Sequence, residues 1–312
     1  MNNTSSRSIA KKIYYILRPL IPRSMQLSMR RRFIKTQIEK YKDVWPILEK
    51  AATPPKNWKG WPENKKFALV LTHDVELQGG HDKCPQLMKL EMDLGFRSCF
   101  YIVPERYNVD PRLRAMLVEN GFEVGLHGLN HDGKLYESKE TFLYRAGRIN
   151  EYMKEWNAVG FRSPAMHHNL EWIHNLNIEH DASTFDTDPF EPQPDGAETI
   201  FPFWVKGTGN FKGYVELPYT LPQDFALYII MQEKDNSLWK NKVDWIVSKG
   251  GMVLLDVHPD YINFDKRPNG PEEFPLEFYS GLLEYIKSKY EGQYWHVLPQ
   301  EMAKFWRENY KE

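Results

Sequence analysis

The stretch FALVLTHDVE, residues 67–76, decides the fold. Its first half, residues 67–71, is an unbroken apolar run, which is typical of a parallel strand buried on both faces. Polar residues follow at once. Side chains two apart on an extended chain point to the same side, so Asp74 and Glu76 can share one site. Such a carboxylate pair suits a division of labour in which one group binds a metal ion and the other accepts a proton.

Strand-like and helical runs alternate along the rest of the chain. We expect strands at 98–103, 123–126 and 252–255 and helices at 112–120 and 140–156. This alternation predicts parallel strands joined by crossover helices. A single α/β barrel takes about 250 residues, so the chain of 312 residues fits one barrel with an additional arm. We place a helical arm and linker at 1–60 and the barrel at 61–312.

Two histidines follow the expected strand at 123–126. His127 and His131 are four residues apart, and one helical turn would bring their rings to one face. A single histidine is usually structural, but a pair at this spacing after a strand indicates metal ligands. Two neutral imidazoles and one carboxylate would leave positions open for water, as a hydrolytic metal requires.

An arginine and a third histidine follow two other expected strands. Arg162, in GFRSP at 160–164, could hold a carboxylate base by a bidentate contact, although a surface salt bridge is the alternative. His258 ends the late strand and is placed to donate a proton to a leaving amine. Because the carboxyl ends of parallel strands form one face of a barrel, these groups are expected at one site.

Taken together, five ordered segments resemble the polysaccharide deacetylase domain (NodB-homology, carbohydrate esterase family 4). They are THDVE at 72–76, HxxxH at 127–131, FRSP at 161–164, the segment 181–190 and DVH at 256–258. The resemblance implies a distorted seven-stranded (β/α) barrel. It also implies metal-dependent hydrolysis of acetamido groups on N-acetylated sugars of a polysaccharide or glycan precursor, as in cell-surface polysaccharide biosynthesis.

The resemblance also implies a role for each matching residue. His127 and His131 would bind a divalent metal, most often zinc, and Asp74 would be the catalytic base. Arg162 would tether that base, and His258 would be the general acid. The fourth segment contains Asp186 and Asp188, and one of these two would orient the acid histidine.

Two positions depart from the family pattern. Val75 stands where the family has its metal-binding aspartate, so we assign Glu76 as the third ligand. Asp256 replaces a leucine of the acetyl pocket, which puts the substrate in doubt. Two other functions therefore stay open. One is a catalytically impaired carbohydrate-binding pseudoenzyme, and the other is a barrel amidase acting on a small cyclic amide.

The first forty residues differ in charge from the rest of the chain. They hold ten Lys or Arg and one acid, so the net charge of −1 leaves the remainder at about −10. Met25, Met29 and Phe33 recur at helical spacing beside Arg30–Arg32. This basic amphipathic helix would either dock on an anionic membrane surface or pack on the barrel. The acidic body argues against nucleic-acid binding.

The sequence also bears on location. No apolar run approaches the roughly 18 residues of a membrane-spanning helix, and the run at 13–17 is too short for a signal peptide. Cys84 and Cys99 have no metal-ligand or redox spacing. We predict a cytoplasmic protein, in which any peripheral contact with an anionic membrane would be made through residues 1–40.

Overall fold

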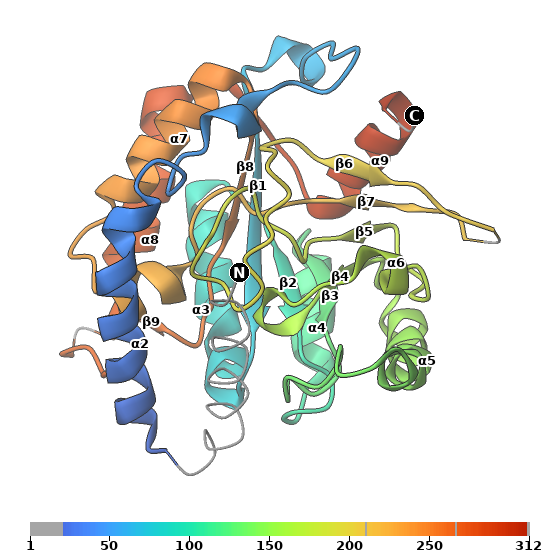
Figure 1. The fold of residues 1–312 in the computed structure, drawn as a ribbon, viewed down its shortest axis with the longest axis horizontal. Coiled ribbons are helices and arrows are strands. Elements are labelled where there is room, and N and C mark those ends of the chain that lie inside the picture. The colour runs from blue at the N-terminus through green and yellow to red at the C-terminus, as the bar shows by residue number, and fades with distance from the viewer. Residues whose placement is uncertain (1–20, 210, 266, 311–312) are drawn as a thin grey trace, which may run out of the picture.

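The computed structural model describes residues 21–209, 211–265 and 267–310, and it confirms the expected α/β class. Its centre is a curled, mostly parallel sheet surrounded by helices (Figure 1). The strands are β1 (Phe67–Val75), β2 (Cys99–Ile102), β3 (Glu123–His127), β4 (Gly160–Arg162), β5 (His180–Asp181), β6 (Phe203–Val205), β7 (Tyr214–Glu216), β8 (Met252–Asp256) and β11 (Tyr294–His296). A separate two-stranded sheet pairs β9 (Ile262–Asn263) with β10 (Phe274–Pro275).

The main sheet has the wall of a distorted barrel. Seven strands run parallel to one another in the order β8-β1-β2-β3-β4-β5-β7, β11 pairs in parallel with the start of β1, and β6 is antiparallel to β7. Strand pairing does not join β7 to β8 among the described residues. Instead, the amides of Thr220 and Leu221 donate to the carbonyl of Leu254 on β8, so a loop spans this gap.

Helices cover the outside of the sheet. They are α2 (Arg23–Gln37), α3 (Gln78–Leu94), α4 (Pro111–Glu119), α5 (Lys139–Trp156), α6 (Leu170–Ile173), α7 (Ser237–Lys249), α8 (Leu276–Tyr290) and α9 (Pro299–Asn309), with a π-helix, η6 (Phe225–Met231). The starts of α4 and α5 are set by side chains, because Asp110 and Ser138 accept hydrogen bonds from the first free amides. Figure 1 shows α2, α7 and α8 grouped on one side of the strands.

Strand β1 lies at the centre of the core, and all nine of its residues are buried. It pairs with β8, β2 and β11, which explains why its sequence lacks the alternation of a half-exposed strand. The burial extends to His73, whose Nε2 lies 2.7 Å from Glu91 Oε1 on α3 and whose Nδ1 lies 2.9 Å from the carbonyl of Val257. His73 therefore has a structural role.

Helix α2 of the arm packs on the barrel, which was one of the two alternatives predicted for this basic helix. Leu27 and Ile34 are buried against η6, and Arg31 Nε donates to the carbonyl of Ile229 at 2.9 Å. The opposite face of α2 carries the exposed side chains Met25, Met29 and Phe33. Contact of this face with anionic lipid stays a prediction.

Part of the arm lies outside the described residues. Four of the ten basic residues among the first forty, Arg7, Lys11, Lys12 and Arg18, precede residue 21. Among the helices that the structure describes, none has the length and apolarity needed to cross a bilayer. Cys84 and Cys99 are both buried and unpaired.

Candidate metal centre and active site

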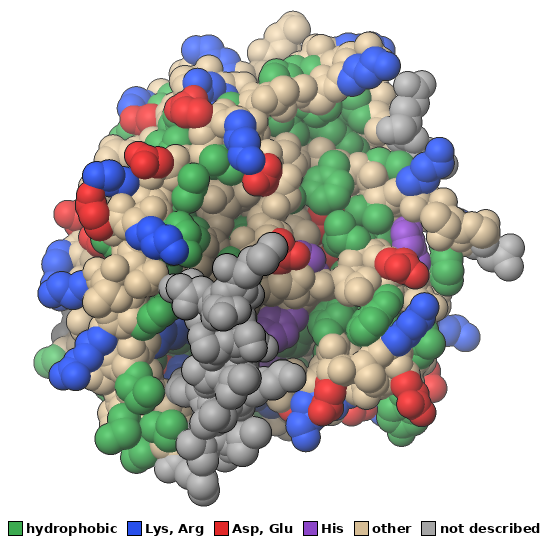
Figure 2. Space-filling model, viewed as in Figure 1, with side chains coloured by type: hydrophobic (Ala, Val, Ile, Leu, Met, Phe, Trp, Pro, Cys, Tyr) green, Lys and Arg blue, Asp and Glu red, His purple; other side chains and the backbone are tan. Residues whose placement is uncertain are grey.

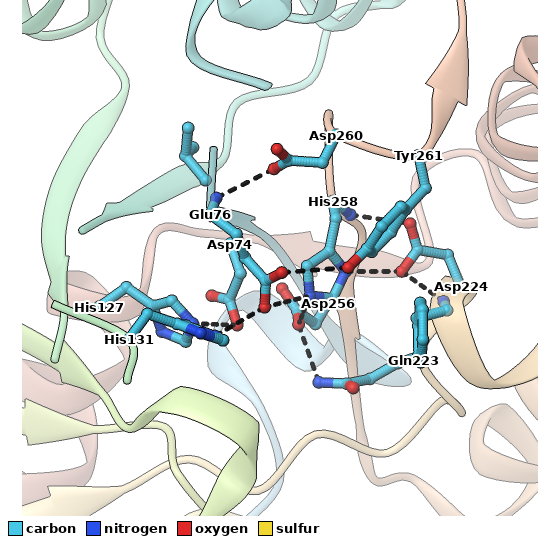
Figure 3. Close-up of polar contacts among 12 residues, drawn as sticks. Asp74, Glu76, His127, His131, Gln223, Asp224, Asp256, His258, Asp260 and Tyr261 are labelled. Carbon is cyan, nitrogen blue, oxygen red and sulfur yellow. Dashed lines mark hydrogen bonds and ion pairs between the residues drawn. The ribbon is translucent and has the colours of Figure 1, made fainter. Parts of the chain in front are cut away.

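Three side chains from two strand ends meet at one mouth of the barrel. Glu76 directly follows β1, His127 ends β3, and His131 lies four residues further on (Figure 3). Glu76 Oε1 is 2.8 Å from His131 Nε2, and the two imidazole centroids are 5.1 Å apart. One potential ligand atom from each residue lies within 4.8 Å of the others, which is close enough to share one cation. Figure 2 shows histidine and acidic side chains gathered near the middle of one face.

A loop, not the expected helical turn, brings the two histidines together. Residues 128–131 are not helical, and both Gly128 (φ +63°) and His131 (φ +51°) have left-handed backbone conformations. A Cβ on Gly128 would lie 2.5 Å from Pro164 Cγ, so only glycine fits between the two loops. The sequence therefore predicted the spacing of His127 and His131 but not the backbone path between them.

The electrostatics of these residues suit a cation. Burial, together with the neighbouring charge of His131, lowers the pKa of His127 well below its ordinary value, so this imidazole is neutral, the form that binds metals. Burial alone would raise the pKa of Glu76, but His131 lowers it well below the usual range and keeps the carboxylate ionised. His127 Nε2 is buried without a hydrogen-bond partner, and His131 Nε2 is buried against Glu76 Oε1, which is the arrangement expected of atoms that share a cation.

Arg162 joins two acids next to this centre. Its Nη1 lies 3.1 Å from Asp74 Oδ1 and 2.7 Å from Asp256 Oδ1, and its Nε donates to the carbonyl of Ala182 at 2.8 Å. Asp74 therefore receives one hydrogen bond from the guanidinium, and the expected bidentate contact is absent. The arginine divides its charge between the acids because β1 and β8 both approach it.

The acids outnumber the cations at this mouth. Asp74, Glu76, Asp224 and Asp256 face Arg162 and His258. Burial, and then the charge of Asp256, raises the pKa of Asp74 well above its ordinary value even though Arg162 opposes the shift. Acidic side chains therefore exceed basic ones among these neighbours. A divalent cation would offset part of this excess and lower the pKa of Asp74.

His258 is oriented by Asp224, which the sequence analysis missed. His258 Nδ1 lies 2.7 Å from Asp224 Oδ1, and the His258 amide donates to Asp224 Oδ2 at 2.8 Å. Burial would lower the pKa of His258, but the charges of Asp224 and Asp256 raise it well above the ordinary value. The ring is therefore protonated, with Nε2 directed toward Glu76 and Asp256, 3.9 Å from an oxygen of each (Figure 3).

The assignment of Asp186 or Asp188 to this orienting role is wrong. The Asp186 carboxylate pairs with Lys242 of α7 at 2.7 Å. Asp188 accepts hydrogen bonds from the amide of Phe190 and the hydroxyl of Tyr219. The chain beyond β5 turns toward α7, so it cannot supply the partner of His258. The start of η6 supplies that partner instead.

The buried pair Asp186–Lys242 yields a stability prediction. Lys242→Met should leave Asp186 buried without a cation and cost about 3–5 kcal/mol of unfolding free energy near pH 8. The pKa of Asp186 is already raised to about 6 by burial. The folded state thus binds the proton more tightly than the unfolded state, and stability falls as pH rises through this pKa. Losing Lys242 should raise the pKa further. Urea unfolding at pH 5 and 8 measures the effect, and an equal loss at both pH values would contradict this account.

Two further residues of the site had little sequence signal. Asp224 precedes η6 and caps it by accepting a hydrogen bond from the amide of Phe225, but the three-residue strand β7 before it gives too short a pattern to locate a strand end. Gln223 Nε2 donates to Asp256 Oδ2 at 3.0 Å. A polar pair after the prolines at 218 and 222 is the one available hint, and it is weak.

Comparisons with known proteins identify the fold. No protein-family model matches this chain, and no curated protein matches it by sequence. Solved structures do match: the fold is that of the polysaccharide deacetylases. A protein from Pseudomonas aeruginosa PAO1 assigned as a polysaccharide deacetylase has a TM-score of 0.61 and 15% identity, covering 81% of this chain and 94% of its own.

Two other structures are similar to the same extent. A protein from Mycobacterium smegmatis, also assigned as a polysaccharide deacetylase, has a TM-score of 0.60 and 18% identity over 82% of this chain and 95% of its own. The Puue allantoinase has a TM-score of 0.63 and 15% identity over 86% of this chain and 99% of its own. At these identities the likeness establishes the fold and leaves the reaction open.

Proposed function

We propose that this protein is a metal-dependent carbohydrate N-deacetylase, which hydrolyses acetamido groups on N-acetylated sugars of a polysaccharide or glycan precursor. One observation carries the proposal. Glu76, His127 and His131 converge beside a base candidate held by Arg162 and an acid candidate held by Asp224. The metal-dependent mechanism proposed here uses these three components within reach of one scissile bond.

The donor set fits a divalent cation such as zinc. Two imidazoles and one carboxylate leave open positions, which is typical of catalytic zinc sites. When bound, such a cation polarises a carbonyl and lowers the pKa of a coordinated water to about 7. The buried Nε2 atoms of His127 and His131, the second of them beside Glu76 Oε1, and the excess of negative charge support this assignment.

The chain's own residues divide the proton transfers. Asp74, fixed by Arg162, accepts a proton from the attacking water, whose oxygen bonds to the carbonyl carbon. His258 donates the proton on Nε2 to the nitrogen as the carbon–nitrogen bond breaks, and Asp224 holds Nδ1 throughout. The products are acetate and a free amino sugar. The same geometry keeps the base and the acid on separate elements, β1 and the loop after β8.

The two departures from the family pattern bear on the alternatives. Val75 does not remove the third ligand, because Glu76 places an oxygen beside His131, and this argues against an impaired pseudoenzyme. Gln223 and Asp256 place polar atoms close to His258. That polar wall favours a second candidate function, hydrolysis of a small cyclic amide. The two candidates share one metal centre and differ in substrate.

Chelation tests the common part of both candidates. Removing the metal should abolish amide hydrolysis, and adding zinc should restore it, because the cation is the group proposed to polarise the carbonyl. Metal content is followed by mass spectrometry, and hydrolysis by acetate release from N-acetylated glycans and ring opening of a cyclic amide. Acetate release supports the deacetylase, and ring opening alone supports the second candidate. Full activity of metal-free protein would refute both.

A further inference from the structure

We infer that Tyr261 is a positioning residue that keeps one oxygen of Glu76 available to the cation. The inference rests on the metal centre proposed above. Tyr261 Oη donates to Glu76 Oε2 at 3.0 Å, whereas Glu76 Oε1 lies 2.8 Å from His131 Nε2 (Figure 3). The two oxygens of this carboxylate thus have different partners, and the hydroxyl occupies the one turned away from His131.

The backbone of Glu76 is held by the residue before Tyr261. Asp260 Oδ2 accepts a hydrogen bond from the Glu76 amide at 2.9 Å, and Asp260 Oδ1 accepts one from the Leu77 amide at 3.0 Å. A Cβ on Gly80 would lie 2.3 Å from Asp260 Oδ2, so α3 leaves space for this carboxylate only because residue 80 is glycine. Residues 260 and 261 together hold both the main chain and the side chain of Glu76.

The ring of Tyr261 is itself fixed. Its centroid is 5.0 Å from that of Phe225 and 5.1 Å from that of His258. Its amide donates to the carbonyl of His258, and its carbonyl accepts from the amide of Phe274 on β10. Tyr261 therefore lies between the acid candidate and the metal ligand. A hydroxyl presented from such a rigid ring limits the torsions of the glutamate side chain, which has one more rotatable bond than aspartate.

Tyr261→Phe tests this role because it removes only the hydroxyl. The apparent Kd for zinc should rise about 10- to 100-fold, the usual effect of losing a group that orients a metal ligand. Competition with a chromophoric chelator measures it. The matched control is Tyr214→Phe, which removes a hydroxyl that donates to the carbonyl of Leu170 at 2.9 Å, away from the site. The visible spectrum of the cobalt-loaded protein should change in Tyr261→Phe and stay unchanged in Tyr214→Phe.

The outcomes separate this inference from the proposed function. If the parent protein binds zinc, His131→Ala does not, and Tyr261→Phe binds zinc as the parent does with an unchanged cobalt spectrum, then Tyr261 has no positioning role and the metal centre stands. If the parent itself fails to bind zinc, the metal centre and the role of Tyr261 both fall. Circular dichroism and thermal unfolding establish that each variant is folded. A cobalt spectrum altered equally in both tyrosine variants would also count against the inference.

Discussion

His131→Ala is expected to remove bound zinc and to lower kcat/KM for amide hydrolysis by about a thousandfold or more. His131 Nε2 lies 2.8 Å from Glu76 Oε1, and its ring is next to that of His127, so two ligands would remain without the third. A cation that polarises a carbonyl supplies several kcal/mol of transition-state stabilisation, and each 1.4 kcal/mol is a factor of ten in rate. Metal analysis and steady-state kinetics on the same preparation measure the two losses.

The control for His131→Ala is His174→Ala. His174 is a partly buried histidine whose ring packs on Phe211 and Tyr214 and is not among the candidate ligands. The His174→Ala protein should keep its zinc and most of its activity. A His131→Ala protein that keeps one equivalent of zinc would show that the cation binds elsewhere. Zinc loss without loss of activity would show that hydrolysis does not use this centre.

Asp224→Asn should lower kcat by about 10²- to 10⁴-fold, the range typical of losing a general acid, while zinc stays bound. Asp224 Oδ1 accepts from the Phe225 amide at 2.8 Å and lies 2.7 Å from His258 Nδ1, and Oδ2 accepts from the His258 amide at 2.8 Å. All three partners are donors, so the side-chain NH₂ of asparagine would face a second donor and could not form a hydrogen bond with it. The imidazole would lose both its orientation and the negative charge that favours its protonated form.

A pH profile distinguishes this role from a structural one. The charge of Asp224 raises the pKa of His258, and an acid must be protonated to act. Activity should fall as pH rises through that pKa, and in Asp224→Asn the fall should begin at lower pH. Asp186→Asn is the matched control, since Asp186 pairs with Lys242 rather than His258. If Asp186→Asn shifts the alkaline limb and Asp224→Asn does not, the orienting acid has been misassigned here.

The parts of the site that lie on long strands could be predicted from sequence. β1 and β8 are apolar runs with polar residues at their carboxyl ends, and in a parallel barrel those ends share one face. Asp74 and His258 could therefore be placed near each other before any coordinates. The fold class followed from the same pattern, because unbroken apolar strands alternating with helices have few other stable arrangements.

The remaining parts depend on tertiary contacts without a local pattern. Asp224 follows a strand of only three residues and precedes a π-helix. Neither the two-residue period of a strand nor the 3.6-residue period of an α-helix therefore identifies it in the sequence. Tyr261 acts through its distance to Glu76 in the fold, which no spacing in the sequence encodes. The path from His127 to His131 depends on the approach of Pro164 to Gly128, a contact between loops more than thirty residues apart.

The guanidinium of Arg162 has a consequence for any change of substrate. It comes from β4, its Nη1 contacts acids on β1 and β8, and its Nε binds a carbonyl beyond β5. One side chain thus links β4 to β1, to β8 and to the residue after β5, and its charge also lowers the pKa of Asp74. A variant selected for a different substrate would have to keep a hydrogen-bond acceptor at position 256, because Arg162 donates to Asp256. Reshaping the pocket and preserving the fold are therefore coupled, and substitutions with apolar residues at this position should require a second change nearby.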